Sequence, residues 1–108
     1  MDIDEVRELV GSGIYEVSIH AQQERLAENL DIGDIEAAIL SGEIIEDYPT
    51  DPRGPSCLVS GHAGSGPVHV VIGWAYRKTG DQPTLRVITV YIPKLPKWKD
   101  NRTRGKKA

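Results

Sequence analysis

The sequence of 108 residues lacks phenylalanine, has a single cysteine and contains no long apolar run. Cys57 on its own excludes an internal disulfide and a zinc site built from several cysteines. No apolar run approaches the roughly 18 residues that a membrane-spanning helix needs. The opening residues, MDIDEVREL, are acidic, whereas a signal peptide begins with basic residues and continues with an apolar stretch. We therefore expect a cytoplasmic protein that does not enter a membrane.

The charge is divided unevenly between the two halves of the chain. Residues 1–51 contain fourteen acidic and two basic side chains, and residues 52–108 contain two acidic and eleven basic ones. Such asymmetry can indicate a surface for nucleic acid or for an acidic partner. Acidic surface helices followed by a basic tail would produce the same pattern without any partner. Both interpretations fit the composition.

The N-terminal part is predicted to form three helices. Apolar residues recur at helical spacing over about 2–10, 19–29 and 32–40. Ser18 and Asp31 precede the second and third of these segments and are predicted N-caps.

The apolar residues of the second helix predict which of its sides is buried. Ile19 and Leu26 are expected to face the core, together with Leu30. Glu24 is expected to be exposed to solvent.

After the third helix the pattern changes to β-strands. Strands are predicted at 43–48 and 56–61, and a hairpin is predicted over 67–93 with its turn at 79–82. Helices followed by strands predict an α+β fold, with the helices packed on one face of an antiparallel sheet of about four strands.

A chain of this length forms one domain. We expect residues 1–98 to form it, with Trp98 docked on the domain. The basic residues 99–108 are expected to be disordered, because they contain little that could be buried.

The hairpin makes a specific prediction about side-chain positions. If its strands pair symmetrically about Gly80, His69 lies opposite Tyr91 and Val71 lies opposite Thr89. These side chains then share one face of the sheet, which we expect to be partly open. The other, more apolar face should meet the helices and carry Val68, Val70, Ile72, Trp74, Ile88, Val90 and Ile92.

An imidazole, a phenol and a hydroxyl on one face are groups that metal-free RNA cleavage can use. The reaction needs a base for the 2′-hydroxyl, an acid for the leaving oxygen and cations for the charge of the transition state. His20 and His69 are candidate base and acid, and Tyr91 is a candidate donor. The candidate cations are Arg25, Lys94, Lys97 and Lys99. The alternative is a histidine that is simply hydrogen-bonded within a packed sheet.

The spacing of the histidines does not match a metal site. Neither H-x-x-x-H nor H-E-x-x-H occurs, so we expect no metal and no other cofactor. His62 lies in a glycine-rich turn and is expected to be a solvated loop residue.

Several short motifs occur in an order that resembles a known family. They are Ser18 with His20-Ala21, GEIIEDYP at 42–49, PSCL at 55–58, PVHVV at 67–71, ITVYIP at 88–93, and Trp98. Over about residues 15–98 the chain resembles the DUF4258 family, a domain of unknown function in bacteria and archaea. The family is grouped with RelE-like toxins in a wider barnase-, colicin- and RelE-like ribonuclease fold. The resemblance therefore implies a RelE-like fold with helices followed by a curved antiparallel sheet.

The resemblance also implies roles for individual residues. His20 matches the family's helix histidine and His69 its strand histidine, which implies proton transfer. Thr89 and Tyr91 match the T-x-Y of the last strand and are expected to contact phosphate. RelE-like relatives rely on strand lysines and arginines, and the strands here offer Arg86.

The second helix departs from the family pattern. The family commonly has an arginine four residues after the helix histidine, where this chain has Glu24. Arg25 follows one position later, about 100° around the helix. A carboxylate in place of a cation would be unfavourable beside a phosphate.

The leading hypothesis is a toxin of toxin–antitoxin type that acts as an RNA endonuclease without metal. Some family members are encoded beside a small zinc-finger and helix-turn-helix protein, which implies an antitoxin partner. The alternative is a non-catalytic protein-binding module that uses the open sheet face or an edge strand. A structural dimer that pairs through Trp98 and the hairpin edge is a third hypothesis.

Overall fold

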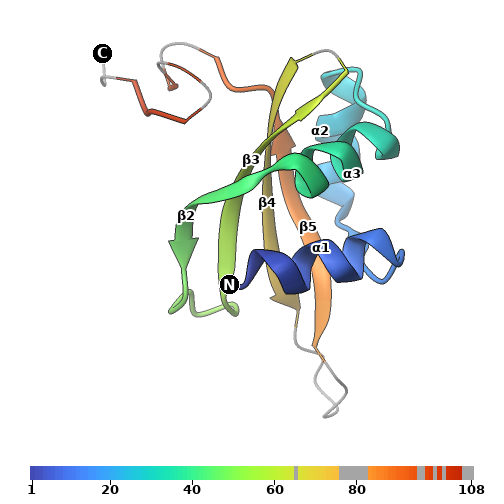
Figure 1. Ribbon diagram of the computed structural model, residues 1–108, viewed down its shortest axis with the longest axis vertical. Coiled ribbons are helices and arrows are strands. Elements are labelled where there is room, and N and C mark those ends of the chain that lie inside the picture. Colours follow the sequence, from blue (N-terminus) through green and yellow to red (C-terminus); the bar gives the residue numbers. More distant parts are fainter. Residues whose placement is uncertain (65, 76–82, 95–96, 99, 101, 106–108) are drawn as a thin grey trace.

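The computed structural model describes residues 1–64, 66–75, 83–94, 97–98, 100 and 102–105 and has the expected α+β fold (Figure 1). In this part of the chain the elements are α1 (Ile3–Gly11), β1 (Glu16–Val17), α2 (Ile19–Ala27), α3 (Ile32–Ser41), β2 (Glu43–Tyr48), β3 (Ser56–Ala63), β4 (Gly66–Ala75) and β5 (Thr84–Tyr91). The three predicted helices are confirmed. The hairpin turn predicted at 79–82 lies outside the described residues. No helix within the described ranges is long and apolar enough to cross a membrane.

Each helix begins at a residue whose side chain caps it. Asp2 accepts a hydrogen bond from the backbone N–H of Asp4, at the start of α1. Ser18 caps α2 in the same way, and Asp31 caps α3 through a capping box with Asp34. These side chains satisfy backbone donors that have no partner inside the helix. The N-caps predicted at Ser18 and Asp31 are confirmed.

The strands form one mixed sheet in the order β1-β5-β4-β3-β2. Neighbours from β2 to β5 pair antiparallel, whereas β1 pairs in parallel with β5 through Glu16 and Val17. The expectation of about four antiparallel strands is corrected to five strands in a mixed sheet. The sequence did not reveal β1 because a two-residue strand has no periodicity of its own.

α1 and α3 lie across one face of the sheet (Figure 1). α3 packs so closely on β3 that a Cβ atom at Gly61 would lie 1.8 Å from the carbonyl oxygen of Ala38. Glycine is required at this position because a side chain would push the helix away from the strand. The core between these layers includes Val6, Val10, Ile35, Ile39, Val59, Val68, Val70, Ile72, Leu85, Val87 and Val90.

α2 lies along the outer edge of β5, where β1 ends. The backbone N–H of Ser18 donates to the carbonyl of Val87 at 2.9 Å, and its Oγ donates to the carbonyl of Ile88 at 3.0 Å. The backbone N–H of Val90 donates to Oε1 of Glu24 at 3.1 Å. α2 thereby satisfies backbone groups that an open sheet edge would leave exposed.

This placement corrects the expected orientation of α2. Ile19 and Leu26 are 79% and 67% exposed, whereas Ala21 is fully buried. Glu24, expected in solvent, is partly buried against β5. The side of α2 that meets the sheet edge carries Ala21, which joins the core, and Glu24, which binds the backbone of β5. Leu30, just after the helix, is buried as predicted.

The register predicted for the hairpin is confirmed at the two decisive pairs. His69 pairs with Tyr91, and Val71 pairs with Thr89. Because side chains alternate between the faces of a sheet, these four lie on the face opposite α1 and α3.

Beyond these pairs a β-bulge changes the register. Ile72 pairs with Val87, so the symmetric pairing about Gly80 does not continue towards the turn. Ile88, which was expected on the helix face, lies at the bulge and lines a groove on the opposite face. Val87 takes the buried position in the core instead. A bulge of this kind places one extra residue in a strand and redirects its side chains.

Candidate functional site

A groove of about 530 Å³ lies on the face of the sheet opposite α1 and α3. Residues from the start of α2, the β2–β3 loop and strands β3, β4 and β5 line it: Ser18, His20, Asp51, Arg53, Gly54, Ser56, Val71, Gly73, Trp74, Ala75, Arg86, Ile88 and Thr89. Gly73 also lines the groove. A Cβ atom at this position would lie 2.8 Å from Cδ1 of Ile88, so a larger residue would displace that side chain. The groove therefore combines hydroxyl, imidazole and guanidinium groups over an apolar floor.

The cations of the groove are each held by a carboxylate. Arg86 Nε donates to Glu16 Oε1 at 2.5 Å, from β5 to β1. Arg53 Nε donates to Asp51 Oδ1 at 3.4 Å within the β2–β3 loop. Hydrogen bonds from the backbone and side chain of Arg53 lower the pKa of Asp51. Guanidinium groups that are fixed in this way retain further N–H donors for a second anion.

His20 stands at the rim of the groove, in the first turn of α2. Its side chain is 66% exposed, and its Nε2 lies 3.3 Å from Oε1 of Glu24. The Oγ of Ser18 fixes the start of α2 by accepting from Ala21 and donating to Ile88. The imidazole is thus accessible to a ligand and attached to a rigid part of the fold.

His69 is in the opposite environment. It lies on the same sheet face, yet it is 0% exposed. Its ring meets that of Trp98 edge-on, with centroids 4.4 Å apart, and Trp98 is itself buried. The predicted docking of Trp98 is confirmed, and the expectation that this face is partly open is wrong at His69. The alternative of a hydrogen-bonded histidine in a packed sheet describes it correctly.

Tyr91 connects the two buried rings. Its Oη lies 3.1 Å from Nδ1 of His69 and accepts a hydrogen bond of 3.1 Å from Nε1 of Trp98. Since an indole N–H can only donate, the phenol hydrogen is available for the imidazole. Burial raises the pKa of Tyr91, so the phenol stays neutral and able to donate.

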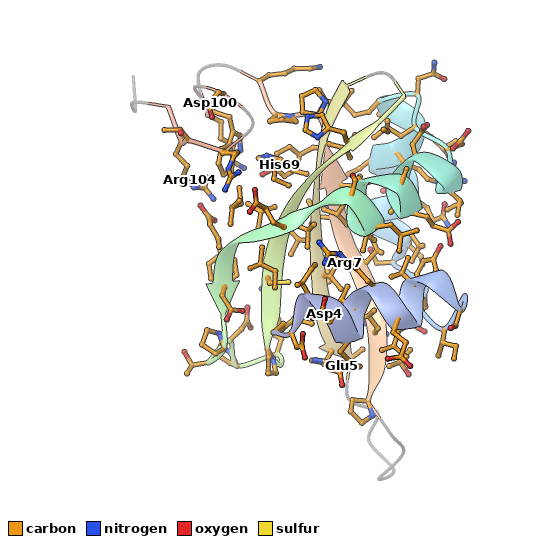
Figure 2. All side chains as sticks on the ribbon, in the orientation of Figure 1. Asp4, Glu5, Arg7, His69, Asp100 and Arg104 are labelled. Atoms are coloured by element: carbon orange, nitrogen blue, oxygen red, sulfur yellow. The ribbon has the colours of Figure 1, made fainter. Side chains whose placement is uncertain are left out.

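Arg104 and Glu46 hold this cluster from the outside. Two guanidinium nitrogens of Arg104 donate to Glu46 at 2.7 Å each, and the guanidinium carbon lies 4.5 Å from the ring centroid of Trp98. Figure 2 shows Arg104 beside His69 at the same end of the sheet. The hydrogen bonds from Arg104 lower the pKa of Glu46, and the hydrogen bond to Glu46 raises the pKa of Tyr48.

The other predicted cations are dispersed. Arg25 donates to Gln22 and to the carbonyl of Leu30, and thus stabilises the end of α2. Lys94 pairs with Glu28 at 3.4 Å. Lys97 lies 5.2 Å from the ring centroid of Tyr91. Lys99 lies outside the described residues. Of the proposed substrate-binding residues that the structure describes, Arg86 alone lines the groove.

Several residues of these sites were not anticipated from the sequence. Arg53 reaches the groove from the proline-rich β2–β3 loop, and Ser56 follows it on β3. Glu46 on β2 and Arg104 near the C-terminus form an ion pair although they are far apart in the chain. A basic residue within the loop PTDPRGP was the only local signal. Among the described residues no three His, Cys, Asp or Glu side chains are grouped closely enough to hold a metal ion.

Comparison with known proteins identifies a family for this chain. A model of the family described as "Domain of unknown function (DUF4258)" matches residues 17–92, which is most of the chain. Neither the curated proteins nor the solved structures contain a match. The matched span includes the groove residues of β4 and β5 together with His69 and Tyr91, and it ends before Trp98.

Proposed function

The chain belongs to the DUF4258 family, and on this premise we propose that it is a RelE-like protein of toxin–antitoxin type that binds RNA in the groove and cleaves it without a metal ion. The observation that supports this most is the convergence of His20, Arg86 and Thr89, from α2 and two parts of β5, on one groove. The arrangement of helices on one face of a largely antiparallel sheet supports the RelE-like assignment.

The proposed reaction is an attack of the ribose 2′-oxygen on the adjacent phosphorus. A base takes the 2′-hydroxyl proton, the bond from phosphorus to the 5′-oxygen breaks, and an acid protonates that leaving oxygen. His20 performs one of these proton transfers because its ring is exposed in the groove. Arg86 and Arg53 offset the charge on the phosphate oxygens, since guanidinium groups pair with phosphate in a bidentate geometry.

Thr89 and Ser18 have different parts in this proposal. Thr89 lines the groove, and we assign its hydroxyl to a phosphate oxygen. Ser18 already uses its hydroxyl for Ala21 and Ile88 and therefore positions His20. Glu24, the departure from the family pattern, binds the backbone of Val90 and so belongs to the framework of α2.

An RNA assay with chelator present tests this proposal. Purified wild type is incubated with a labelled single-stranded RNA in EDTA and compared with His20→Ala and Arg86→Ala. We expect His20→Ala to slow cleavage about 100-fold or more, because proton transfer contributes on that scale. Arg86→Ala should weaken RNA binding and reduce its dependence on salt.

His62→Ala is the matched control, because His62 is exposed and lies outside the groove. It is near the end of β3, paired with Pro67, and not in a loop as the sequence predicted. The variant should cleave and bind as the wild type does. Equal cleavage by His20→Ala and His62→Ala would refute the role of His20. An absence of RNA binding at the groove in the wild type would refute the function as a whole.

A second candidate function is a non-catalytic protein-binding module. One observation favours it: β2 is the last strand of the sheet, and no other described strand pairs with its outer edge. An extended segment of an antitoxin partner can add to such an edge through backbone hydrogen bonds. In that case adding the antitoxin partner would perturb the NMR signals of β2. His20→Ala would leave the affinity of the protein for this partner unchanged.

A further inference from the structure

Some of the residues that follow β5 pack over the second histidine, where Trp98 meets the ring of His69 edge-on. We call residues 97, 98, 100 and 102–105, which the structure describes, the C-terminal strap. We propose that the C-terminal strap is a releasable cover that keeps His69 and Tyr91 away from RNA until it opens. This inference rests on the proposed RNA-cleaving function. The strap lies outside the span that the family model matches, whereas His69 and Tyr91 lie inside it.

The covered residues continue the groove. Val71 and Thr89 pair across β4 and β5 and line the groove, and His69 and Tyr91 form the next pair on the same face. Two residues along a strand span about 7 Å, close to the spacing of neighbouring phosphates in an extended RNA strand. If the cover is removed, the groove gains an imidazole and a phenol one nucleotide step from Thr89.

This part of the sheet is buried although α1 and α3 lie on the other face. Leu58, Ser60 and His69 lie on the face opposite the helices, yet they are 2%, 6% and 0% exposed. Trp98 lies against His69 and donates to Tyr91, as described above. Among the described residues of the strap, Trp98 is therefore the one shown to cover His69 and Tyr91.

The strap is attached to the rest of the fold through Trp98 and through ion pairs of Arg102 with Glu43 and of Arg104 with Glu46. Trp98 is its only buried residue among those that the structure describes. Arg104 clamps the indole through its bidentate pair with Glu46, and the backbone N–H of Gly105 donates to the carbonyl of Lys97 at 2.9 Å. Arg104 is 47% exposed, and ion pairs at the surface are weak and sensitive to salt. RNA can compete for Arg104, because phosphate offers the same bidentate acceptor as a carboxylate.

The cover explains how one sheet face holds two histidines in such different states. Cleavage of RNA without metal needs both an acid and a base. With the strap closed, His20 is available and His69 is not, so RNA binds without both groups being in place. Release of the strap supplies the missing partner. Tyr91 then holds the His69 ring through the Nδ1 contact, and the ring takes part in proton transfer.

Chemical labelling of the histidines tests the cover without reference to RNA. The full chain is treated with diethyl pyrocarbonate, and modification of each histidine is followed by mass spectrometry. In the wild type, His20 and His62 should react and His69 should be protected. In Trp98→Ala, His69 should react at least about tenfold faster, because the segment that protects it has lost its main anchor.

A second pair of variants keeps the indole in place. Arg104→Glu faces Glu46 with a like charge and should also accelerate the labelling of His69. Arg53→Glu is the matched control for charge reversal, since Arg53 pairs with Asp51 in the β2–β3 loop and is not part of the strap. It should leave the labelling rate of His69 unchanged. Circular dichroism identifies any variant that has lost its fold, and Arg104→Glu decides the question if Trp98→Ala is one of them.

The outcomes separate the cover from the function. Labelling of His69 in the wild type at the rate of His62, or continued protection in folded Trp98→Ala and Arg104→Glu, would overturn the cover. Faster RNA cleavage by both variants, abolished again by adding His69→Gln, is the result expected if both proposals hold. Exposed His69 without RNA binding in any variant would refute the RNA function while the cover stands.

Discussion

The groove beside α2 and the covered region around His69 occupy one face of one sheet, but they are built in different ways. The groove lies between β5 and the capped start of α2, among other segments. Its histidine, His20, is 66% exposed. The covered region is closed by side chains of the C-terminal strap, and its histidine is fully buried. Main-chain pairing makes a rigid open site, whereas a few side-chain contacts make a site that can be opened.

The sharpest test of this contrast compares the two histidines directly. His69→Ala should lower the free energy of unfolding by about 2–4 kcal/mol, because it leaves a cavity and removes a buried hydrogen-bond partner. His20→Ala should change it by no more than about 0.5 kcal/mol, as is usual for exposed positions. Urea denaturation followed by circular dichroism measures both. Similar losses in the two variants would contradict the difference in burial.

An intermediate effect is expected at the hydroxyl that connects the covered rings. Tyr91→Phe leaves Nδ1 of His69 and Nε1 of Trp98 without their shared partner and should destabilise the fold by about 1–3 kcal/mol. Tyr48→Phe is the control, because Tyr48 is 40% exposed and its hydroxyl group bonds at the surface to Glu46 and Arg104. Its loss should be smaller by at least half. Chemical denaturation of both variants under one buffer condition provides the comparison.

The smallest effect concerns the pH dependence of the stability that the ion pair between Glu46 and Arg104 contributes. The pKa of Glu46 in the folded protein is lowered from the ordinary value of 4.5, chiefly by Arg104. The ion pair therefore contributes stability above pH 4.5, and this contribution is lost as the pH falls through the folded-state pKa. Glu46→Gln should be less stable than the wild type by about 0.5–1 kcal/mol at pH 7, given the exposure of the pair.

The difference between Glu46→Gln and the wild type should disappear as the pH falls below 4.5. Unfolding curves at a series of pH values measure it. A gap that stays constant to pH 3 would show that the loss does not come from the charge of Glu46. The same variant should also speed the labelling of His69, which connects this ion pair to the cover.

The features predictable from the sequence are those set by near neighbours. The caps at Ser18 and Asp31 depend on residues within the same turn, and the pairing of His69 with Tyr91 follows from alternation along a short hairpin. The bulge at Ile88 was not predictable, because it arises where Ser18 binds the backbone of β5.

The orientation of α2 shows why apolar periodicity can mislead. Ile19 and Leu26 have the spacing of a buried stripe, and both are exposed. The rule assumes that a helix packs on the apolar face of a sheet, but α2 packs against an edge. There the partners are backbone N–H and C=O groups, which require Ser18 and Glu24 rather than apolar side chains.

The sequence by itself determined the α+β order, the helix caps, the two pairs of the hairpin and the family. Each of these depends on contacts between residues that are close in the chain or on a pattern of residue types. The tertiary structure alone decided that His20 is open and His69 is closed. That outcome depends on Trp98, Arg104 and Glu46, which come together only after the sheet has formed, because burial is a property of the whole fold and not of a local segment.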